Sequence, residues 1–219
     1  MTLSDTQLER YARHIVLKEI GGAGQARLLS ADVAVIGAGG IGSPAILYLA
    51  AAGVGTIRVI DDDHVALSNL QRQVLFGTAD IGAPKAERAM AAVARINPDV
   101  KLLPINARID ADNASLILRD ADVVLDGCDS FATRLAVADA AQALRIPLVS
   151  SAVGPFEGQL ATYKGWQPGL PCYRCLFPAP PPAGTVPSCS EAGVLGAAAG
   201  VMGALQALEV LKDAAGLGT

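Results

Sequence analysis

A glycine-rich segment, Gly37-Ala38-Gly39-Gly40-Ile41-Gly42, is the first pattern in the chain that could do chemistry. It follows a short apolar run and precedes a helix-like stretch. Glycines at this spacing let the backbone bring a phosphate against the amides of a helix N-terminus. Asp61 ends the next apolar run, where a carboxylate can accept hydrogen bonds from a ribose hydroxyl. The pattern predicts a nucleotide site. An NAD-dependent oxidoreductase is its first interpretation, and a ligand-free turn is the structural alternative.

Polar and cationic residues beyond Asp61 favour a different nucleotide chemistry. The segment Ser68-Asn69-Leu70-Gln71-Arg72-Gln73 follows Asp61-Asp62-Asp63, and Lys85 lies further along the chain. A dinucleotide site usually needs one acidic ribose acceptor, whereas Arg72 and Lys85 can neutralise a triphosphate and the pyrophosphate that leaves it. The alternative is that Arg72 is a solvated loop cation and Lys85 an ordinary residue in the first turn of a helix.

A third acidic position follows the buried-type run 122–126, in the sequence Asp126-Gly127-Cys128-Asp129-Ser130. Ligands of open α/β sheets lie at the carboxyl ends of parallel strands, so Asp129 is well placed to hold Mg²⁺ on a nucleotide. Asp129 could instead be the N-cap of a helix that starts near Phe131. Cys128 is expected to be a small buried apolar residue.

The cysteines indicate metal or redox chemistry rather than a secreted disulfide framework. Two of the four form Cys172-x-x-Cys175, which has the spacing of half a tetrahedral zinc site; a metal-free thiol pair is the alternative. The segment from Pro168 to Ser190 is rich in proline and also contains Cys189, so it is expected to be a long functional loop. The charged N-terminus has no signal-peptide core, which predicts a cytoplasmic protein.

Alternating apolar runs predict the scaffold that positions these groups. Strands are expected at 33–36, 57–60, 101–105, 122–126 and 147–151, and helices at 4–20 (with Ser4 or Asp5 as N-cap), 43–52, 85–96, 111–119, 131–144 and 193–211. This alternation predicts an α/β, doubly wound, Rossmann-like and mostly parallel sheet with an N-terminal helix and a long Pro/Cys-rich crossover loop. We expect one domain over 1–219: an N-terminal arm (1–30), a nucleotide-binding core (31–165), the Cys/Pro-rich loop (166–192) and a C-terminal helix (193–219).

The composition argues against a disordered, a nucleic-acid-binding and a membrane protein. The chain has 219 residues, 52% apolar and 17% charged, with a formal net charge of −4. Plentiful aliphatic residues argue against disorder, and the net charge with no basic run argues against nucleic-acid binding. The apolar segment 193–211 is near the length of a membrane span, but it is rich in Ala and Gly and contains Glu209. A buried or interface helix is therefore expected there, and no membrane association.

The sequence resembles the ThiF/MoeB adenylyltransferases, bacterial relatives of ubiquitin-activating enzymes. The matching stretches run in order along nearly the whole chain: RYARHIVL (10–17), GAGGIGSPA (37–45), LSNLQRQVLF (67–76), DIGAPKAE (80–87), ADVVLD (121–126), FEGQL (156–160), CYRCLFP (172–178), CSEAGVLG (189–196) and GVMGALQALEVLK (200–212). Arg-Gln after SNLQ and the spaced Lys85 separate the chain from dehydrogenases that share only the glycine turn.

The resemblance implies adenylation of the C-terminal glycine carboxylate of a small ubiquitin-like sulfur carrier, with Mg·ATP as the nucleotide and release of pyrophosphate. It implies a carrier that ends in Gly-Gly and a role in thiamine or molybdenum cofactor biosynthesis. It also implies a homodimer in which Arg13 reaches the phosphates of the other subunit. The implied catalytic residues are Arg72, Lys85, Asp129 and Cys189, where Cys189 would form a covalent link to the carrier. The implied nucleotide-binding residues are Arg13, Gly39, Gly40, Asp61, Asp63, Ser68, Asn69, Gln73, Lys85 and Ser130.

Two departures from the family pattern stand out. After the run 121–126 the family commonly has Cys-Thr-Asp-Asn, where this chain has Gly127-Cys128-Asp129-Ser130, so the aspartate is kept and the asparagine is not. The family also has a second Cys-x-x-Cys near its C-terminus, which this sequence lacks. Either the chain is a shortened version or zinc is absent. The competing functions are adenylation of a small-molecule or tRNA-bound carboxylate, an NAD-dependent oxidoreductase, and a member that binds without turnover.

Overall fold

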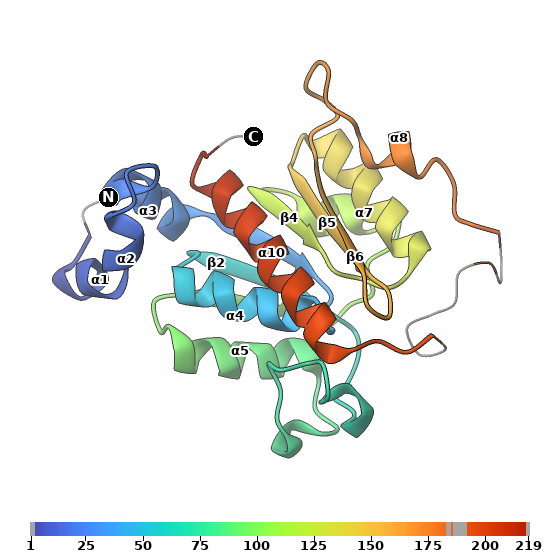
Figure 1. Ribbon diagram of the computed structural model, residues 1–219, viewed down its shortest axis with the longest axis horizontal. Coiled ribbons are helices and arrows are strands. Elements are labelled where there is room, and N and C mark those ends of the chain that lie inside the picture. The colour runs from blue at the N-terminus through green and yellow to red at the C-terminus, as the bar shows by residue number, and fades with distance from the viewer. Residues whose placement is uncertain (1–2, 183–184, 186–191, 218–219) are drawn as a thin grey trace.

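The computed structural model describes residues 3–182, 185 and 192–217, and its centre is a six-stranded sheet (Figure 1). The strand order is β3-β2-β1-β4-β5-β6. All neighbouring pairs are parallel except β5 and β6, which are antiparallel. The bounds are β1 (Asp32–Ile36), β2 (Thr56–Ile60), β3 (Lys101–Ile105), β4 (Val123–Asp126), β5 (Leu148–Val153) and β6 (Gly158–Tyr163). The predicted mostly parallel α/β sheet is confirmed, and β6 is a strand that the sequence reading did not include.

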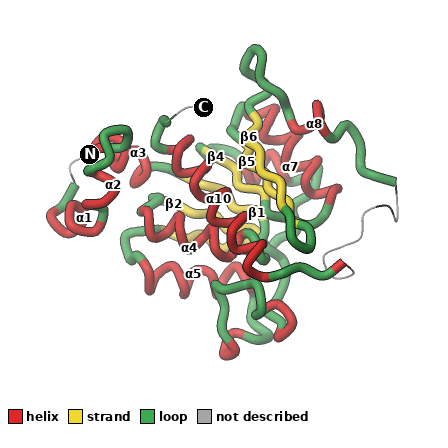
Figure 2. The backbone as a smooth tube through the Cα atoms, in the orientation of Figure 1, coloured by secondary structure: helices red, strands yellow, loops and turns green. Residues whose placement is uncertain are grey.

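Helices cover both faces of the sheet because successive strand residues point to opposite sides. Val33 and Val35 belong to one apolar cluster, and Ala34 and Ile36 to another. The first cluster receives α4 (Gly42–Ala52), α5 (Lys85–Ile96) and α10 (Gly196–Ala214), while the second receives α6 (Ala114–Leu118) and α7 (Phe131–Leu144). This double cover is the predicted doubly wound arrangement (Figure 2).

The predicted bounds of α5, α7 and β3 match those of the structure, whereas α6 is shorter than the predicted 111–119. The carboxylate of Asp110 accepts hydrogen bonds from the backbone N–H groups of Asp112 and Asn113. These bonds hold a turn in front of Ala114, so the helix begins three residues later than expected.

The apolar C-terminal segment is a core helix. In α10, Ala207 and Val210 are buried against α4 and the sheet, and the Gln206 amide donates to the backbone oxygens of Asp126 and Val149, both at 2.8 Å. These bonds tie the helix to β4 and β5. Across the described ranges, no helix has the length and apolar character needed to cross a membrane.

The N-terminal segment differs from the single helix predicted over 4–20. It forms α1 (Asp5–Arg10), α2 (Ala12–Ile15) and α3 (Gly21–Ser30). Ser4 is the N-cap of α1, as predicted, and makes a capping box with Gln7. The break falls at Tyr11, whose ring is 2% exposed and whose hydroxyl accepts a 2.8 Å hydrogen bond from the Asn97 amide. The backbone of Tyr11, with φ −101° and ψ 14°, is outside helical geometry, and α2 ends at Ile15 rather than at residue 20.

The described part of the proline-rich segment, residues 168–182 and 185, is mainly a loop, and it contains the short helix α8 (Tyr173–Leu176). The ring of Tyr173 is buried and packs edge-on against Tyr163 of β6, with centroids 5.4 Å apart. This contact fixes the Cys172–Cys175 turn against the sheet. Cys189 lies outside the described residues.

Candidate active site

A cavity of about 520 Å³ opens at the carboxyl ends of β1, β2 and β4. These strands lie at the centre of the sheet. From β1 the chain first adds β2 and β3 on one side and then β4 and β5 on the other, and ligands of such sheets usually bind at the point where the order changes direction. Its lining brings together most of the predicted site residues: Gly39, Gly40, Asp61, Asp63, Asn69, Arg72, Gln73, Lys85, Asp129 and Ser130. Among the described residues, Ser68 and Arg13 lie outside this lining.

The glycine turn joins β1 to α4 and needs glycine at two positions. Gly37 has a positive φ of 87°, and a Cβ at Gly42 would overlap the Gly37 carbonyl oxygen. The Ser43 hydroxyl closes the turn by donating to the Ala38 oxygen at 3.0 Å. A Cβ at Gly39 would have no atom within 4 Å, so the space in front of this residue is open to a ligand. The turn therefore presents backbone at the start of α4, as phosphate binding requires.

Asp61 follows β2 and is attached to the glycine turn. One carboxylate oxygen accepts a 2.7 Å hydrogen bond from the Ala38 N–H, and the other accepts one of 2.9 Å from the Asp63 N–H. Burial raises the pKa of the Asp61 carboxyl, against the lowering influence of Lys85 and of these two N–H groups. The carboxylate is thus held in one orientation at the cavity wall with lone pairs left to accept from a ligand hydroxyl.

Lys85 is the first residue of α5, and its ammonium reaches the cavity. Its side chain is 5% exposed and donates to the Asp63 carboxylate at 2.8 Å, while the Asp63 side chain is 71% exposed. The lysine is therefore held in place by its surroundings, and its partner can turn into solvent. An incoming phosphate oxygen can replace the Asp63 carboxylate without leaving either charge buried and alone.

Arg72 and Gln73 follow the short 3₁₀ turn η1 (Leu67–Asn69). The Arg72 guanidinium donates to the Ser68 backbone oxygen at 3.0 Å, and the stem of Arg72 lies against Gly40. The Asn69 side-chain oxygen accepts from the Ala66 N–H at 3.2 Å, which shapes the turn. Gln73 is buried, and within the described part of the chain its side-chain oxygen has no hydrogen-bond partner. A polar group of this kind in a cavity wall is expected to meet a ligand or water.

The loop after β4 contains the cap of the helix that follows it. Ser130 is the N-cap of α7, and its hydroxyl oxygen accepts from the Thr133 N–H at 3.4 Å, so the N-cap alternative for Asp129 is wrong. Asp129 is instead exposed at the cavity wall. Burial raises the pKa of the Cys128 thiol well above its usual range, and Cys128 packs against the second apolar cluster, as a small apolar residue would.

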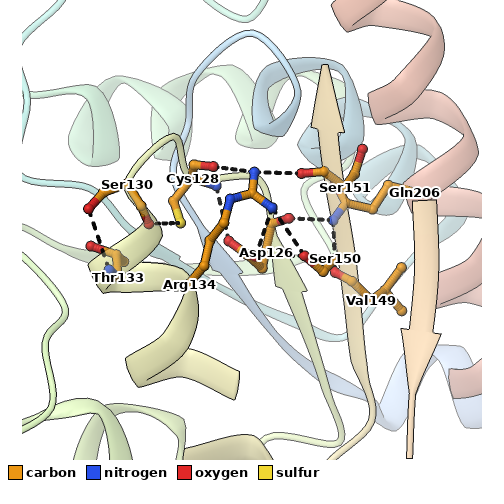
Figure 3. Close-up of polar contacts among 9 residues, drawn as sticks. All are labelled: Asp126, Cys128, Ser130, Thr133, Arg134, Val149, Ser150, Ser151 and Gln206. Atoms are coloured by element: carbon orange, nitrogen blue, oxygen red, sulfur yellow. Dashed lines mark hydrogen bonds and ion pairs between the residues drawn. The ribbon is translucent and has the colours of Figure 1, made fainter. Parts of the chain in front are cut away.

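A buried polar network behind this loop was not predicted from the sequence (Figure 3). The Arg134 guanidinium lies among Asp126, Cys128, Ser150 and Ser151. Asp126 is fully buried and also accepts 2.8 Å from the Ser150 hydroxyl. The signal available in the sequence was a single arginine in the mostly apolar helix after Asp129.

A second cavity, of about 430 Å³, adjoins the first. Four residues line both: Phe131, Arg134, Ala152 and Val153. The rest of its wall comes from the β5–β6 hairpin and from α8, with aromatic side chains at Tyr163, Tyr173 and Phe177. The two cavities are therefore neighbours that share these four residues.

Four of the predicted site residues that the structure describes line neither cavity: Arg13, Ser68, Cys172 and Cys175. Arg13 is an exposed residue of α2, at the opposite side of the molecule from α7 and α8 (Figure 2). The Cys172 and Cys175 sulfurs are 3.2 Å apart, and the contact with Cys175 lowers the pKa of the Cys172 thiol. In the part of the chain that the structure describes, no three His, Cys, Asp or Glu side chains group as metal ligands. Two thiols alone do not fit a four-ligand zinc site.

Comparison with known proteins supplies the family. The ThiF family profile matches residues 11–219. The SAMP-activating enzyme E1 of Haloferax volcanii is 51% identical over 212 residues, which cover 97% of this chain and 77% of that protein. The sulfur carrier protein adenylyltransferase of Thermus thermophilus is 47% identical over 223 residues, covering 100% and 82%.

A solved structure supports the fold. The crystal structure of PaaA has a TM-score of 0.83 and 25% identity, and the match covers 99% of this chain and 68% of that one. The predicted family and enzyme class are confirmed by these comparisons: the chain belongs to the ThiF family and is an adenylyltransferase.

Proposed function

We propose that this protein uses ATP to adenylate the C-terminal glycine carboxylate of a small ubiquitin-like sulfur carrier and releases pyrophosphate. One observation carries the proposal: Arg72 and Lys85 line the cavity in front of an open glycine turn, beside the anchored carboxylate of Asp61. Two relatives add support, because their names describe activation of SAMP and adenylylation of a sulfur carrier protein.

The nucleotide is proposed to bind with its ribose on Asp61 and its phosphates along the turn. Gly39 and Gly40 would lie against the phosphates, and the cations of Arg72 and Lys85 would neutralise them. The side chains of Asn69 and Gln73 line the same wall and would bind the nucleotide or its water; the Gln73 oxygen has no hydrogen-bond partner among the described residues. Asp63, Ser68 and Ser130 are proposed as supporting contacts; Asp63 and Ser130 line the cavity, whereas Ser68 holds Arg72 through its backbone.

The reaction needs little covalent participation by the protein. A carboxylate oxygen of the carrier attacks the α-phosphorus, a new acyl–phosphate bond forms, the bond from the α-phosphorus to the bridging oxygen breaks, and pyrophosphate leaves with that electron pair. Arg72 and Lys85 would stabilise the charge that develops on the leaving group. Mg²⁺ commonly uses one or two carboxylates with phosphate oxygens and water, so the exposed Asp129 fits that role, and the ion would supply charge neutralisation at the phosphates.

The second cavity is the proposed approach of the carrier's extended C-terminus. It shares Phe131, Ala152 and Val153 with the nucleotide cavity, so a chain end inside it would point toward the α-phosphate. Two glycines at the end of the carrier suit such a passage, because they add no side chain to it.

Several finer assignments stay predictions. Arg13 would act from the partner of a homodimer, and Cys189 would form a covalent link to the carrier during sulfur transfer. Four other assignments are likewise predictions. They are a role in thiamine or molybdenum cofactor biosynthesis, zinc at Cys172 and Cys175, a cytoplasmic location, and the division of the domain into segments that end at residues 30, 165 and 192. No catalytic step above depends on zinc or on Cys189.

Exchange of labelled pyrophosphate into ATP tests the proposal. We expect exchange that depends on a carrier ending in Gly-Gly and disappears when the terminal glycine is removed. Exchange with small carboxylates in place of the carrier would favour a different acyl substrate. Binding of ATP and carrier without exchange would show a non-catalytic member, and stabilisation by NAD but not by Mg·ATP would favour an oxidoreductase.

A further inference from the structure

Arg134 lies at the boundary between the two cavities. It belongs to α7, is 8% exposed, and is one of the four residues that line both cavities. A buried arginine in an apolar helix is costly unless each of its donors has a partner, so its contacts define its role.

One side of the guanidinium connects two backbone segments. Its Nη2 donates to the Cys128 oxygen and, at 2.7 Å, to the Ser151 oxygen (Figure 3). Cys128 directly precedes Asp129 in the wall of the nucleotide cavity. Ser151 directly precedes Ala152 and Val153, which line both cavities. A single nitrogen therefore joins the segment after β4 to the end of β5.

The other side of the guanidinium is fixed by a buried anion. Nη1 lies 3.4 Å from an Asp126 carboxylate oxygen and donates to the Ser150 hydroxyl at 3.2 Å. The other Asp126 oxygen accepts from the Cys128 N–H at 3.1 Å. The guanidinium thus has a defined orientation, and its planar fork can serve carboxylate and carbonyl groups at once.

We propose that Arg134 is a positioning residue that sets the spacing between the nucleotide loop 127–130 and the end of β5, and so the distance at which the acyl carboxylate meets the α-phosphate. This inference rests on the proposed adenylation, because the spacing matters only if two substrates meet there. Bond formation requires reacting atoms about 3–3.5 Å apart, and a misplacement of about 1 Å can cost about 10²-fold in rate.

Arg134→Lys is the informative variant. The ammonium keeps the positive charge near Asp126, so the buried carboxylate is not left alone. A compact ammonium lacks the second nitrogen of the planar fork, so it cannot bind the two backbone carbonyls and the Asp126 side at once. Arg27→Lys is a matched control, since Arg27 also holds a backbone oxygen, that of Ala215 at 2.7 Å, and lies outside both cavity linings among the described residues.

Two readouts test the role. In carrier-dependent pyrophosphate exchange, we expect Arg134→Lys to lower kcat about 10²-fold while the KM for ATP stays within about threefold. In a background with Cys172, Cys175 and Cys189 changed to serine, we expect the alkylation rate of the Cys128 thiol to rise at least about tenfold in Arg134→Lys, because loosening the loop exposes it. Arg27→Lys should change neither.

The alkylation measurement needs no catalysis. It therefore reports whether Arg134 holds the loop 127–130 in place even if the wild-type enzyme shows no exchange and the proposed function fails. An alkylation rate within about twofold of the parent would overturn the proposal. A loss of exchange that Arg27→Lys shares would also overturn it, since that result would reflect general destabilisation.

Discussion

Lys85 offers the sharpest test of the nucleotide site, and Lys85→Met is the change that removes only its charge. Methionine is similar in length and unbranched, so it can fill the space of the buried lysine stem. The Asp63 carboxylate that loses its partner is 71% exposed and can be hydrated. We therefore expect the free energy of unfolding to change by less than about 1 kcal/mol.

The effect on the reaction should be much larger. Lys85 is 5% exposed and fixed at the start of α5, so its ammonium needs little reorganisation when charge develops on the leaving pyrophosphate. Removing one preorganised donor of this kind costs about 10²–10³-fold in kcat. A loss of about 10²-fold in kcat/KM corresponds to about 2.7 kcal/mol of transition-state stabilisation.

Carrier-dependent pyrophosphate exchange measures this loss, with the unfolding midpoint in urea as the check on folding. Lys101→Met, at an exposed position at the start of β3, is the matched control and should leave both quantities unchanged. A Lys85→Met enzyme that folds normally and exchanges within about threefold of wild type would refute the assignment of Lys85 to the phosphates.

Three further predictions concern the glycine turn, Asp61 and the N-terminal arm. Gly42→Ala should lower the free energy of unfolding by about 1–3 kcal/mol, because its Cβ would overlap the Gly37 oxygen. Gly39→Ala should have the melting temperature of wild type but bind ATP more weakly, because its Cβ would point into the open space of the turn. Equal melting temperatures and equal ATP affinities for the two variants would contradict these roles. Burial raises the pKa of Asp61 above 3.8, so the folded state holds that proton more tightly than the unfolded chain does. The free energy of unfolding of wild type, relative to that of Asp61→Asn, should therefore fall as pH rises from about 4 to 7 in urea titrations. A difference that rises with pH would refute the raised pKa. Gly53→Ala should lower stability by about 1–3 kcal/mol in the same titrations, since Gly53 has a φ of +81° and a Cβ would overlap the Tyr11 ring; an unchanged midpoint would count against that packing.

The central fold was predictable because its signals are local. The glycine turn, the apolar runs of β1 and β2 and the amphipathic α5 each depend on residues close in sequence. β6 escaped prediction because it is an edge strand that is mostly exposed or half-buried, and it lacks the apolar run of the central strands. The break at Tyr11 depends on Asn97, far along the chain, so local periodicity could not show it.

The site was predictable to the same extent. Gly39, Asp61 and Asp129 follow the ends of β1, β2 and β4, and parallel strands bring those ends together. Arg72 and Lys85 come from the segment between β2 and α5, and their charge was the signal that pointed to the same site. The Arg134 network instead depends on Asp126 of β4, Ser150 of β5 and Gln206 of α10, which meet only in the folded sheet. From the sequence alone, Arg134 cannot be told from a surface arginine, because its buried partners lie elsewhere in the sequence.

Transfer of label from ATP to the carrier tests the central claim most directly. Incubation of the protein and a carrier ending in Gly-Gly with ATP labelled at the α-phosphate should place label on the carrier through a hydroxylamine-sensitive acyl bond, and label at the γ-phosphate should leave as pyrophosphate. Label from the γ-phosphate on the carrier, or no carrier label from either position, would contradict adenylation at this site.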